Sequence, residues 1–400
     1  MAKLALCMIV KDEEMNLPKT LDSVKGLVDE IVVLDTGSKD QSVKIAKKYG
    51  AKIPAQFDWV DDFAAARNEA LKSVKSDWVL VLDADEIINQ EAIPAIKKII
   101  ENPNVLVVNL LRKEIGALQS PYSLVSRLFR RHPEINFSRP YHAIIDDTVN
   151  TLLQKESYWR ILELPELAIF HFGYQAEIIV SQNKFERAQR AMEGYLAQHG
   201  VDPYLCSKLG ALYLEQGREK EGISLLKEGL TSNTASDHVT YELRYHLANA
   251  YVREQKLEAA IKHYQKAIEL PLQQRLKLGA YNNLAGVYLT LDMYRAAEEV
   301  YQTVLKIEPD FPMAYYNLGL VYKQADNIPL AIKYYQKAIE LDPQYAAAYQ
   351  NLGVVLLKGG NYQESFEAFQ ESVKLYRQQD PQKAQFLIKE IKSIGMQITE

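Results

Sequence analysis

The chain has little of several things that mark particular classes of protein. Only two of its 400 residues are cysteine, Cys7 and Cys206, and they lie far apart in apolar surroundings. This excludes a disulfide framework and a zinc site built on paired cysteines, so we expect a reducing compartment, the cytoplasm. The formal net charge is -5, so the chain lacks the basic surplus that is typical of nucleic-acid-binding proteins, and no nucleic-acid partner is expected.

Long hydrophobic runs are also missing. The apolar start, 4–10, is too short for a signal peptide and is followed at once by Asp12, Glu13 and Glu14. No run reaches the length that spans a bilayer, so no transmembrane segment is expected. The composition, 48% hydrophobic and 25% charged, is that of an ordinary globular protein, and the length favours at least two domains.

The first 178 residues alternate short apolar runs with amphipathic stretches. They predict buried strands at 4–10, 30–34, 78–82 and 105–111, and helices at 17–27, 42–49 and 63–74. This alternation predicts an α/β domain over residues 1–178, with a Rossmann-like, mostly parallel sheet covered by helices on both faces. From Gly116 to Thr151 the pattern fades, which predicts either a wall of active-site loops or one long irregular connection.

The second half repeats itself every 34 residues. Aromatic, leucine and small residues recur in register: Tyr315, Leu318, Gly319 and Tyr335 match Tyr281, Leu284, Ala285 and Tyr301. The period resembles that of the tetratricopeptide repeat, a pair of helices joined by a turn. We expect an all-α solenoid over 203–377, preceded by a connecting helix at 179–202 and closed by a capping helix at 378–400.

A hydrophobic strand before residue 83 runs directly into two aspartates, Asp83 and Asp85, separated by one small residue. Open α/β sheets bind ligands at the carboxyl ends of their strands. Magnesium ions typically take one or two carboxylates plus substrate phosphates. The pair therefore predicts a divalent cation held between the protein and a diphosphate, whereas the simpler interpretation is that the two aspartates only turn the chain.

Four segments of the first half resemble, in this order, the motifs of family 2 glycosyltransferases of the GT-A fold. They are IVKDEE at 9–14, VVLDTGSKDQS at 32–42, FAAARNEAL at 63–71 and DADE at 83–86. The similarity is greatest to a soluble bacterial branch, in which asparagine usually stands at the position of Asp12. The resemblance implies an inverting hexosyltransferase that uses a nucleotide-sugar donor, expected to be UDP-linked, and Mg²⁺ or Mn²⁺ as cofactor.

The same resemblance implies roles for the donor-site residues. Asp35 would accept a hydrogen bond from the donor base, Glu13 would reach the ribose or the base, and Arg67 would contact the donor. Asp85 would coordinate the metal, with Asp83 on the ribose or on the metal through water. Bland alternatives stand beside these roles: a helix cap for Asp35, a charged helix start for Glu13 and a solvated side chain for Arg67.

An inverting transfer needs a base that takes the acceptor proton. The related enzymes often have Ile-His-Glu where this chain has Ile145, Asp146 and Asp147. Asp147 is the predicted base and Asp146 the second candidate, and an ordinary turn formed by the two aspartates is the alternative. His171, in IFHFGY at 169–174, could contact the metal or the diphosphate, or could be a core histidine.

Two further groups have open interpretations. Arg127, Arg130 and Arg131 could face the diphosphate or form a solvated charge run. Asn283, Asn317 and Asn351 occupy the same position in three successive repeats. Stacked amides can pair with an extended peptide, and a similar ladder is known in O-linked N-acetylglucosamine transferases, so we expect them to bind an acceptor polypeptide. The alternative is that they only pair with neighbouring helices.

Three classes of function compete on the sequence. The leading one is a metal-dependent glycosyltransferase whose repeats recruit an acceptor peptide, protein or glycan, or pair subunits into a homo-oligomer. The second is a non-catalytic tetratricopeptide interaction scaffold with a degenerate nucleotide-sugar-binding domain. The third, a nucleotidyltransferase, usually has a glycine-rich phosphate loop after the first strand, and IVKDEE has none.

Overall fold

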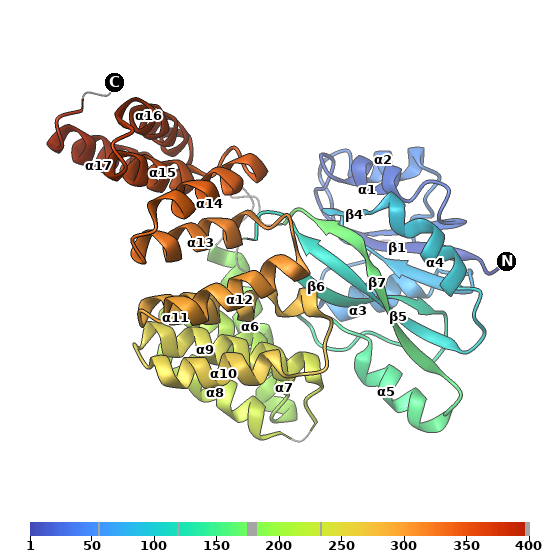
Figure 1. The fold of residues 1–400 in the computed structure, drawn as a ribbon. Helices are drawn as coiled ribbons and strands as arrows, with labels where there is room; N and C mark the ends of the chain where they lie inside the picture. The colour runs from blue at the N-terminus through green and yellow to red at the C-terminus, as the bar shows by residue number, and fades with distance from the viewer. Residues whose placement is uncertain (55–56, 118–119, 174–181, 233, 397–400) are drawn as a thin grey trace. The chain divides into compact units, whose positions relative to one another are not determined.

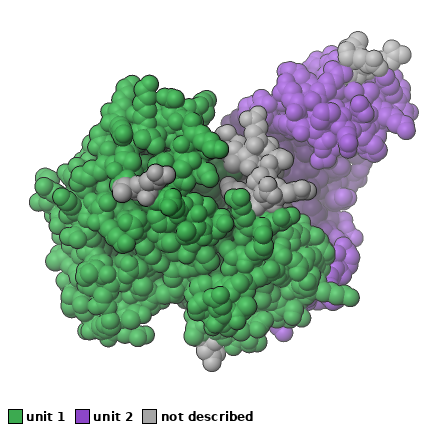
Figure 2. All heavy atoms as spheres, turned by 180° about the vertical axis from the view of Figure 1, so that it is seen from behind, with its two compact units in different colours: residues 1–243 green, residues 244–400 purple. Residues whose placement is uncertain are grey.

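The structure is a computed structural model that describes residues 1–54, 57–117, 120–173, 182–232 and 234–396 (Figure 1). Contacts divide the chain into two compact units, residues 1–243 and 244–400, which Figure 2 colours separately. The division falls within helix α9 (Asp237–Arg253). In the described part of the chain, no helix combines the length and the apolar character needed to cross a membrane.

A seven-stranded mixed sheet forms the core of the first unit, in the order β2-β1-β3-β6-β5-β7-β4. The strands are β1 Leu4–Val10, β2 Glu30–Asp35, β3 Trp78–Val81, β4 Glu86–Ile88, β5 Val105–Glu114, β6 Tyr122–Arg130 and β7 Arg160–His171. Strand β1 pairs in parallel with β2 and β3, and β5 pairs in parallel with β7. Strand β6 runs antiparallel to β3 and β5, and β4 runs antiparallel to β7. The predicted α/β class is confirmed.

Helices cover both faces of this sheet because its first strands bury apolar side chains on both sides. Leu4 and Leu6 of β1 belong to a cluster that includes residues of α1 (Leu17–Ser23), α2 (Ser42–Lys48) and α4 (Ile93–Ile99), the last entered through a 3₁₀ turn, η1 (Gln90–Ala92). Ala5 and Cys7 face the other way, into a cluster with residues of α3 (Phe63–Leu71) and α5 (Asp146–Lys155). This alternation places α3 and α5 on one face and α1, α2 and α4 on the other (Figure 1).

The region that the sequence predicts to be irregular, 116–151, contains regular structure. Strand β6 lies inside the sheet between β3 and β5, and α5 begins at Asp146. The loop prediction was wrong here because the middle of β6 is only half-buried and carries polar side chains such as Ser123, Ser126 and Arg127. Such a strand shows no alternation of apolar and polar residues.

Helical hairpins make up the rest of the chain. The first unit continues with α6 Gln182–His199, α7 Pro203–Glu215 and α8 Glu219–Thr231. The second unit contains α10 Leu257–Ile268, η2 Gln274–Lys277, α11 Leu278–Thr290, α12 Tyr294–Ile307, α13 Pro312–Gln324, α14 Ile328–Leu341, α15 Ala346–Lys358, α16 Tyr362–Gln379 and α17 Pro381–Ser393. The predicted all-α solenoid is confirmed.

The repeats pack through the small and aromatic residues that define their period. Tyr301 and Tyr335, each on the second helix of a pair, are fully buried. A Cβ atom on Gly319 would lie 2.5 Å from the ring of Tyr335, and one on Gly353 would lie 2.8 Å from the ring of Phe369. Small residues on the first helix are therefore needed where the paired helices approach most closely.

Candidate active site

Strands β1, β2 and β3 run parallel to one another, and their carboxyl ends lie at the same end of the sheet. Val10 of β1 pairs with Asp35, the last residue of β2, and Cys7 of β1 pairs with Val81, the last residue of β3. The loops that carry the predicted acids leave the sheet from these ends. This arrangement is the one in which open α/β sheets bind ligands.

Asp83 is held by two arginines. Nη2 of Arg67 donates to Oδ1 at 2.7 Å, and Nη2 of Arg127 donates to Oδ2 at 2.8 Å. Burial favours a higher pKa, but the positive charges of Arg127 and Arg67 hold the pKa of the Asp83 carboxyl well below its usual range. The side chain is still 35% exposed. Asp83 is therefore an ionised carboxylate that orients two guanidinium groups.

Each of these guanidinium groups also has at least one buried nitrogen atom that forms no hydrogen bond with a described residue. The Arg67 side chain is 8% exposed and that of Arg127 is 15% exposed. Nε and Nη1 of Arg67 and Nη1 of Arg127 are buried and have no hydrogen-bond partner within the described residues. A buried donor without a partner costs free energy, so these atoms indicate a site for an anion.

Asp85, the residue before β4, pairs with His171 at the end of β7. Oδ2 of Asp85 lies 3.3 Å from Nε2 of His171, while Nδ1 of His171 contacts Glu114. Burial would lower the pKa of His171, but the hydrogen bonds with Asp85 and Glu114 raise it to about 9. A Cβ atom on Gly173 would lie 2.6 Å from Nε2 of His171 and 3.1 Å from Oδ2 of Asp85. The backbone at this position therefore packs against the pair with no room for a side chain.

A buried ion network supports the pair, and the sequence interpretation missed it. Arg112 of β5 contacts Glu86 at 2.6 Å and Glu114 at 2.8 Å, and Glu86 is fully buried. Glu86 also accepts the backbone N–H of Asp83. Burial favours a higher pKa for Glu114, but His171 and Arg112 lower it to about 2. The available signal was the presence of Arg112 and Glu114 inside an apolar strand.

A β-bulge in β6 connects the two halves of the site. Val108 of β5 pairs with Leu128, and Leu110 pairs with Val125, so Ser126 and Arg127 together oppose a single residue of β5. Bulges redirect side chains and are frequent next to active sites. Arg127 donates to Asp83, and the neighbouring Ser126 donates to Asp146 at 3.3 Å.

The two candidates for the base differ in their surroundings. Asp147 is bound by Arg139, with Nη1 at 2.6 Å from Oδ2 and Nη2 at 3.2 Å from Oδ1, and it also accepts the hydroxyl of Ser138. Asp146 is half-buried beside Ser126, and burial raises the pKa of its carboxyl. A carboxylate with a raised pKa is the better proton acceptor.

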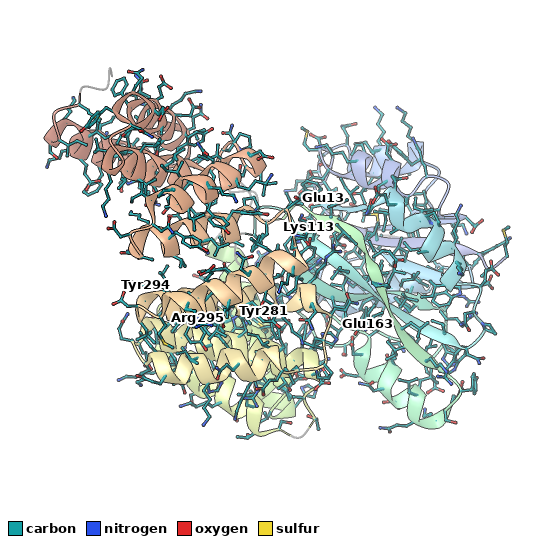
Figure 3. All side chains as sticks on the ribbon, in the orientation of Figure 1. Glu13, Lys113, Glu163, Tyr281, Tyr294 and Arg295 are labelled. Carbon is teal, nitrogen blue, oxygen red and sulfur yellow. The ribbon has the colours of Figure 1, made fainter. Side chains whose placement is uncertain are left out.

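Asp35 is the last residue of β2, and Glu13 lies in the loop after β1. The carboxylate of Asp35 accepts the backbone N–H of Gly37 and Ser38 at 3.2 Å, which closes a tight turn. It does not cap α2, which begins at Ser42 without a side-chain cap. Glu13, labelled in Figure 3, donates its backbone N–H to Ser42 Oγ. Neither contact tests the predicted donor roles.

The structure separates the three neighbouring arginines. Of the three, Arg127 is the one that contacts Asp83. The Arg130 guanidinium lies 4.8 Å from the centre of the Trp78 ring, and Arg131 donates to the backbone carbonyl of Ser76. These two therefore lie at the start of β3, at the opposite end from the site.

The asparagines of the repeats make hydrogen bonds between helices. Asn283 donates to Asn249 at 3.0 Å, Asn317 donates to Asn282 at 2.9 Å, and Asn351 donates to the hydroxyl of Tyr316 at 3.1 Å. Each bond joins the first helices of neighbouring repeats within the second unit. The alternative of pairing between neighbouring helices is thus observed, while acceptor binding stays a prediction.

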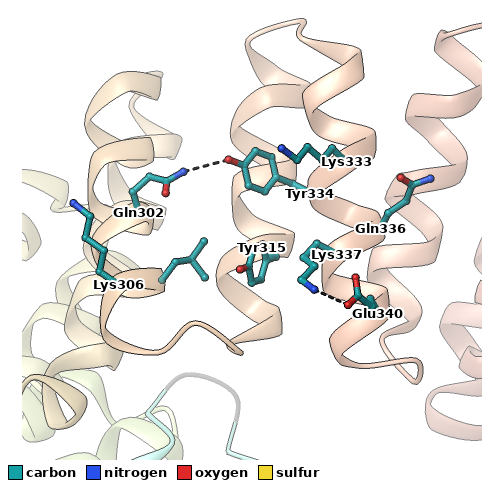
Figure 4. A pocket seen from close by; sticks show the side chains of 9 residues that line it. Gln302, Lys306, Tyr315, Lys333, Tyr334, Gln336, Lys337 and Glu340 are labelled. Carbon is teal, nitrogen blue, oxygen red and sulfur yellow. Dashed lines mark hydrogen bonds and ion pairs between the residues drawn. The ribbon is translucent and has the colours of Figure 1, made fainter.

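Two hollows on the protein are not lined by the acidic residues of the candidate site. One, of about 690 Å³, is bordered by α3, residues 137–140 and α6. The other, of about 640 Å³, lies between helices α12 to α14 of the second unit, where Gln302 donates to Tyr334 and Lys337 pairs with Glu340 (Figure 4). Neither hollow is lined by Asp83 or Asp85.

The described residues contain no group of three or more histidine, cysteine or acidic side chains that could hold a metal by themselves. Asp85 and His171 supply two ligands of suitable chemistry, provided that cation binding displaces the proton of the His171 imidazole. A two-ligand site fits a cation that also binds the phosphates of a substrate.

Comparisons with known proteins assign the N-terminal and C-terminal parts of the chain to different families. Residues 5–162 match the model of glycosyl transferase family 2, and residues 241–273, 293–326 and 310–378 match tetratricopeptide repeat models. The chain therefore has a glycosyl transferase family 2 domain at its N-terminus, followed by tetratricopeptide repeats. It belongs to the same family as a TPR repeat-containing protein of Synechococcus elongatus, to which it is 46% identical over 288 residues, or 72% of this chain and 71% of the relative.

More distant similarities cover one half of the chain at a time. An uncharacterized glycosyltransferase of Rickettsia bellii is 26% identical over 213 residues, which is 50% of this chain and 70% of the relative. Among solved structures, MamA from Desulfovibrio magneticus RS-1 is 25% identical, with a TM-score of 0.39, and the match covers 44% of this chain and 97% of MamA.

Proposed function

We propose that the first unit transfers a hexose from a UDP-linked sugar to an acceptor, with inversion at the anomeric carbon and with Mg²⁺ or Mn²⁺ as cofactor. The observation that carries this proposal is the set of unpartnered N–H groups of Arg67 and Arg127 beside Asp83, at the same strand end as Asp85 and His171. Guanidinium groups that are fixed and unsatisfied are suited to phosphate oxygens.

The arginines bind the diphosphate of the donor. Asp83 holds both guanidinium groups in place, so their remaining N–H bonds are preorganised before the donor arrives. Asp35 and Glu13, at the end of β2 and in the loop after β1, bind the base and the ribose. Because these four groups lie at one edge of the sheet, they bind the nucleotide in an extended form across that edge.

Asp85 and His171 hold the cation. When it is bound, the cation neutralises negative charge on the departing diphosphate. Glu114 contacts the other ring nitrogen of His171, and Arg112 links Glu114 to Glu86, so the histidine is fixed by a buried network. Such supporting contacts orient metal ligands.

Asp146 takes the proton of the acceptor hydroxyl. Among the described residues its carboxylate accepts a side-chain hydrogen bond from the hydroxyl of Ser126, whereas Asp147 is occupied by Arg139. Ser126 and Arg127 are consecutive, and they contact Asp146 and the donor-site Asp83 respectively. The repeats recruit the acceptor, a polypeptide or glycan, through the row of Asn283, Asn317 and Asn351.

The test is a panel of UDP- and GDP-sugars incubated with the protein and Mn²⁺, with release of the nucleoside diphosphate as the readout. We expect release from at least one UDP-sugar, its loss on chelation, and its loss in Asp85→Asn. Asp326→Asn, which removes an exposed carboxylate of the second unit, is the matched control and should leave release unchanged.

No release and no binding of any nucleotide would overturn the proposal. That outcome would favour the scaffold function, in which the repeats alone act.

A further inference from the structure

Arg139 joins the start of α5 to the first helix of the predicted repeat array. It contacts Asp147, in the first turn of α5, and Asp202, the residue that caps α7. Nε of Arg139 also donates to Oδ2 of Asp202 at 3.0 Å. The Arg139 side chain is 7% exposed and that of Asp202 is 15% exposed, whereas Asp147 is 47% exposed. A buried guanidinium therefore depends on both carboxylates, and the loss of Asp202 removes its more buried partner.

The loop around Arg139 is held in an unusual conformation. Arg139 has a φ of +71° and His142 a φ of +52°, both in the left-handed region that non-glycine residues rarely occupy. Such conformations persist where the surroundings fix them. Here the surroundings include Tyr204 of α7, whose ring centre lies 5.4 Å from the Arg139 guanidinium, and Tyr141, which packs against a cluster of α6 and α7 residues.

We infer that Arg139 is a positioning residue, through which helix α7 fixes the start of α5 and so sets the place of the Asp146 carboxylate. This inference rests on the proposed function, because it assigns Arg139 a part in the same reaction. It gives the first helical hairpin after the sheet a part in catalysis that is separate from acceptor recruitment. The family 2 motifs end before α7, so no motif of the sequence identifies this contact.

The sharpest variant is Asp202→Asn. Asparagine keeps the side-chain oxygen that accepts the N–H of Leu205 and caps α7, but it removes the charge that Arg139 binds. Asp380→Asn makes the same change at the cap of α17 in the second unit, where the side chain accepts the N–H of Lys383. Both variants change a helix-capping aspartate to asparagine, but only Asp202→Asn also breaks an ion pair with Arg139.

The measurement is UDP release from the donor that the panel selects, with water as acceptor. For Asp202→Asn we expect kcat to fall about tenfold with an unchanged KM for the donor, because a small displacement of a catalytic group is enough for such a loss. Asp380→Asn should match the wild-type protein. Arg139→Gln should also move the acidic limb of the kcat profile to higher pH, because the Arg139 charge lowers the pKa of Asp146.

Wild-type kcat in both Asp202→Asn and Arg139→Gln would overturn the inference while leaving the proposed function intact. An equal loss in Asp202→Asn and Asp380→Asn would also contradict it, since a cap effect alone would then explain the result. Absence of UDP release from the wild-type protein would instead overturn the proposed function.

Discussion

At the scale of single residues, Gly173 allows the backbone to pass close to the His171 ring and the Asp85 carboxylate. A Cβ atom there would lie 2.6 Å from His171 Nε2 and 3.1 Å from Asp85 Oδ2, so any side chain would displace one of the two groups. Asp83, by contrast, acts through charge, because it keeps two arginines in place. The site therefore combines a geometric requirement with an electrostatic one.

Gly173→Ala tests the geometric requirement. The added methyl group must displace the His171 ring or the Asp85 carboxylate, so we expect metal-dependent UDP release to fall at least about tenfold. The thermal unfolding midpoint should change little, since Gly173 lies outside both hydrophobic clusters of the sheet. Gly194→Ala is the control, because nothing lies within 4 Å of its added Cβ atom. Unchanged release in Gly173→Ala would contradict the predicted metal position.

The sequence predicted those site residues that belong to local motifs. Asp83, Asp85 and Arg67 stand in such motifs, and the structure brings them together. Glu86 also stands in the DADE motif, but its pairing with Arg112 was missed because it joins two distant segments of chain, and no local pattern records it. The role of a charged residue inside an apolar strand becomes visible only when its partner is known.

At the scale of elements, the paired helices of the repeats depend on one small residue each. Gly319→Ala would push a methyl group into the ring of Tyr335, at 2.5 Å. We expect the second unit to lose about 1 to 3 kcal/mol of stability, the usual cost of overpacking a core. The measurement is hydrogen exchange of α13 and α14, which isolates this hairpin from the rest of the chain.

Gly286→Ala is the matched control on the neighbouring first helix. There the added methyl group would meet only the hydroxyl of Tyr301, at 3.8 Å. Alanine favours a helix over glycine by up to about 1 kcal/mol, so this variant should be as stable as the wild-type protein or more stable. Equal destabilisation by both substitutions would refute the packing argument.

Glu30 of β2 fastens the start of β3 to the sheet. It accepts the N–H of Lys75 and of Ser76 and pairs with Lys52. Burial favours a higher pKa for Glu30, but Lys52 and Ser76 lower it to about 2 from 4.5. The ionised form is thus favoured by folding, and its contribution of about 3 kcal/mol is present above pH 4.5 and is lost as the pH falls toward 2.

Glu30→Gln should therefore lower the free energy of unfolding of the first unit at pH 7. Between pH 4.5 and 2 the difference in this free energy between the variant and the wild-type protein should disappear. Urea unfolding followed by tryptophan fluorescence measures this unit alone, because the three tryptophans, Trp59, Trp78 and Trp159, all lie in it. Glu69→Gln removes an exposed pair with Lys72 and should have little effect at any pH. A deficit that does not change with pH would contradict the account of Glu30.

Strand β6 shows what the sequence could not predict about the elements. Its central residues face the site and carry polar groups, so the alternation that marks β1 and β3 is missing. The bulge that aims Ser126 and Arg127 depends on the register with β5, which is a property of the folded sheet. Strands buried on both faces were predictable because their apolar runs are nearly continuous.

For the whole molecule, sequence pattern and compactness divide the chain at different places. The pattern changes near residue 178, whereas the compact units meet at residues 243 and 244. The repeat period of the sequence does not show which helices pack together. Contacts such as that of Arg139 with Asp202 place α7 in the same compact unit as the sheet. The predicted boundaries therefore mark where the sequence pattern changes, whereas the compact units reflect which residues are in contact.

Replacing Asn283, Asn317 and Asn351 by alanine tests whether the two units work separately. The amides bond to neighbouring helices, so we expect the second unit to lose about 1 kcal/mol for each bond. UDP release with water as acceptor should stay unchanged, because these residues lie outside the first unit. Raised KM for a polypeptide acceptor would support recruitment by the asparagines, and unchanged KM would refute it.

A crystal structure with UDP and Mn²⁺ tests the central claim most directly. The account predicts an anomalous manganese peak between Asp85 and His171, with the diphosphate oxygens on the free N–H groups of Arg67 and Arg127. A nucleotide bound elsewhere, or a nucleotide bound at this site with no manganese at Asp85, would contradict it.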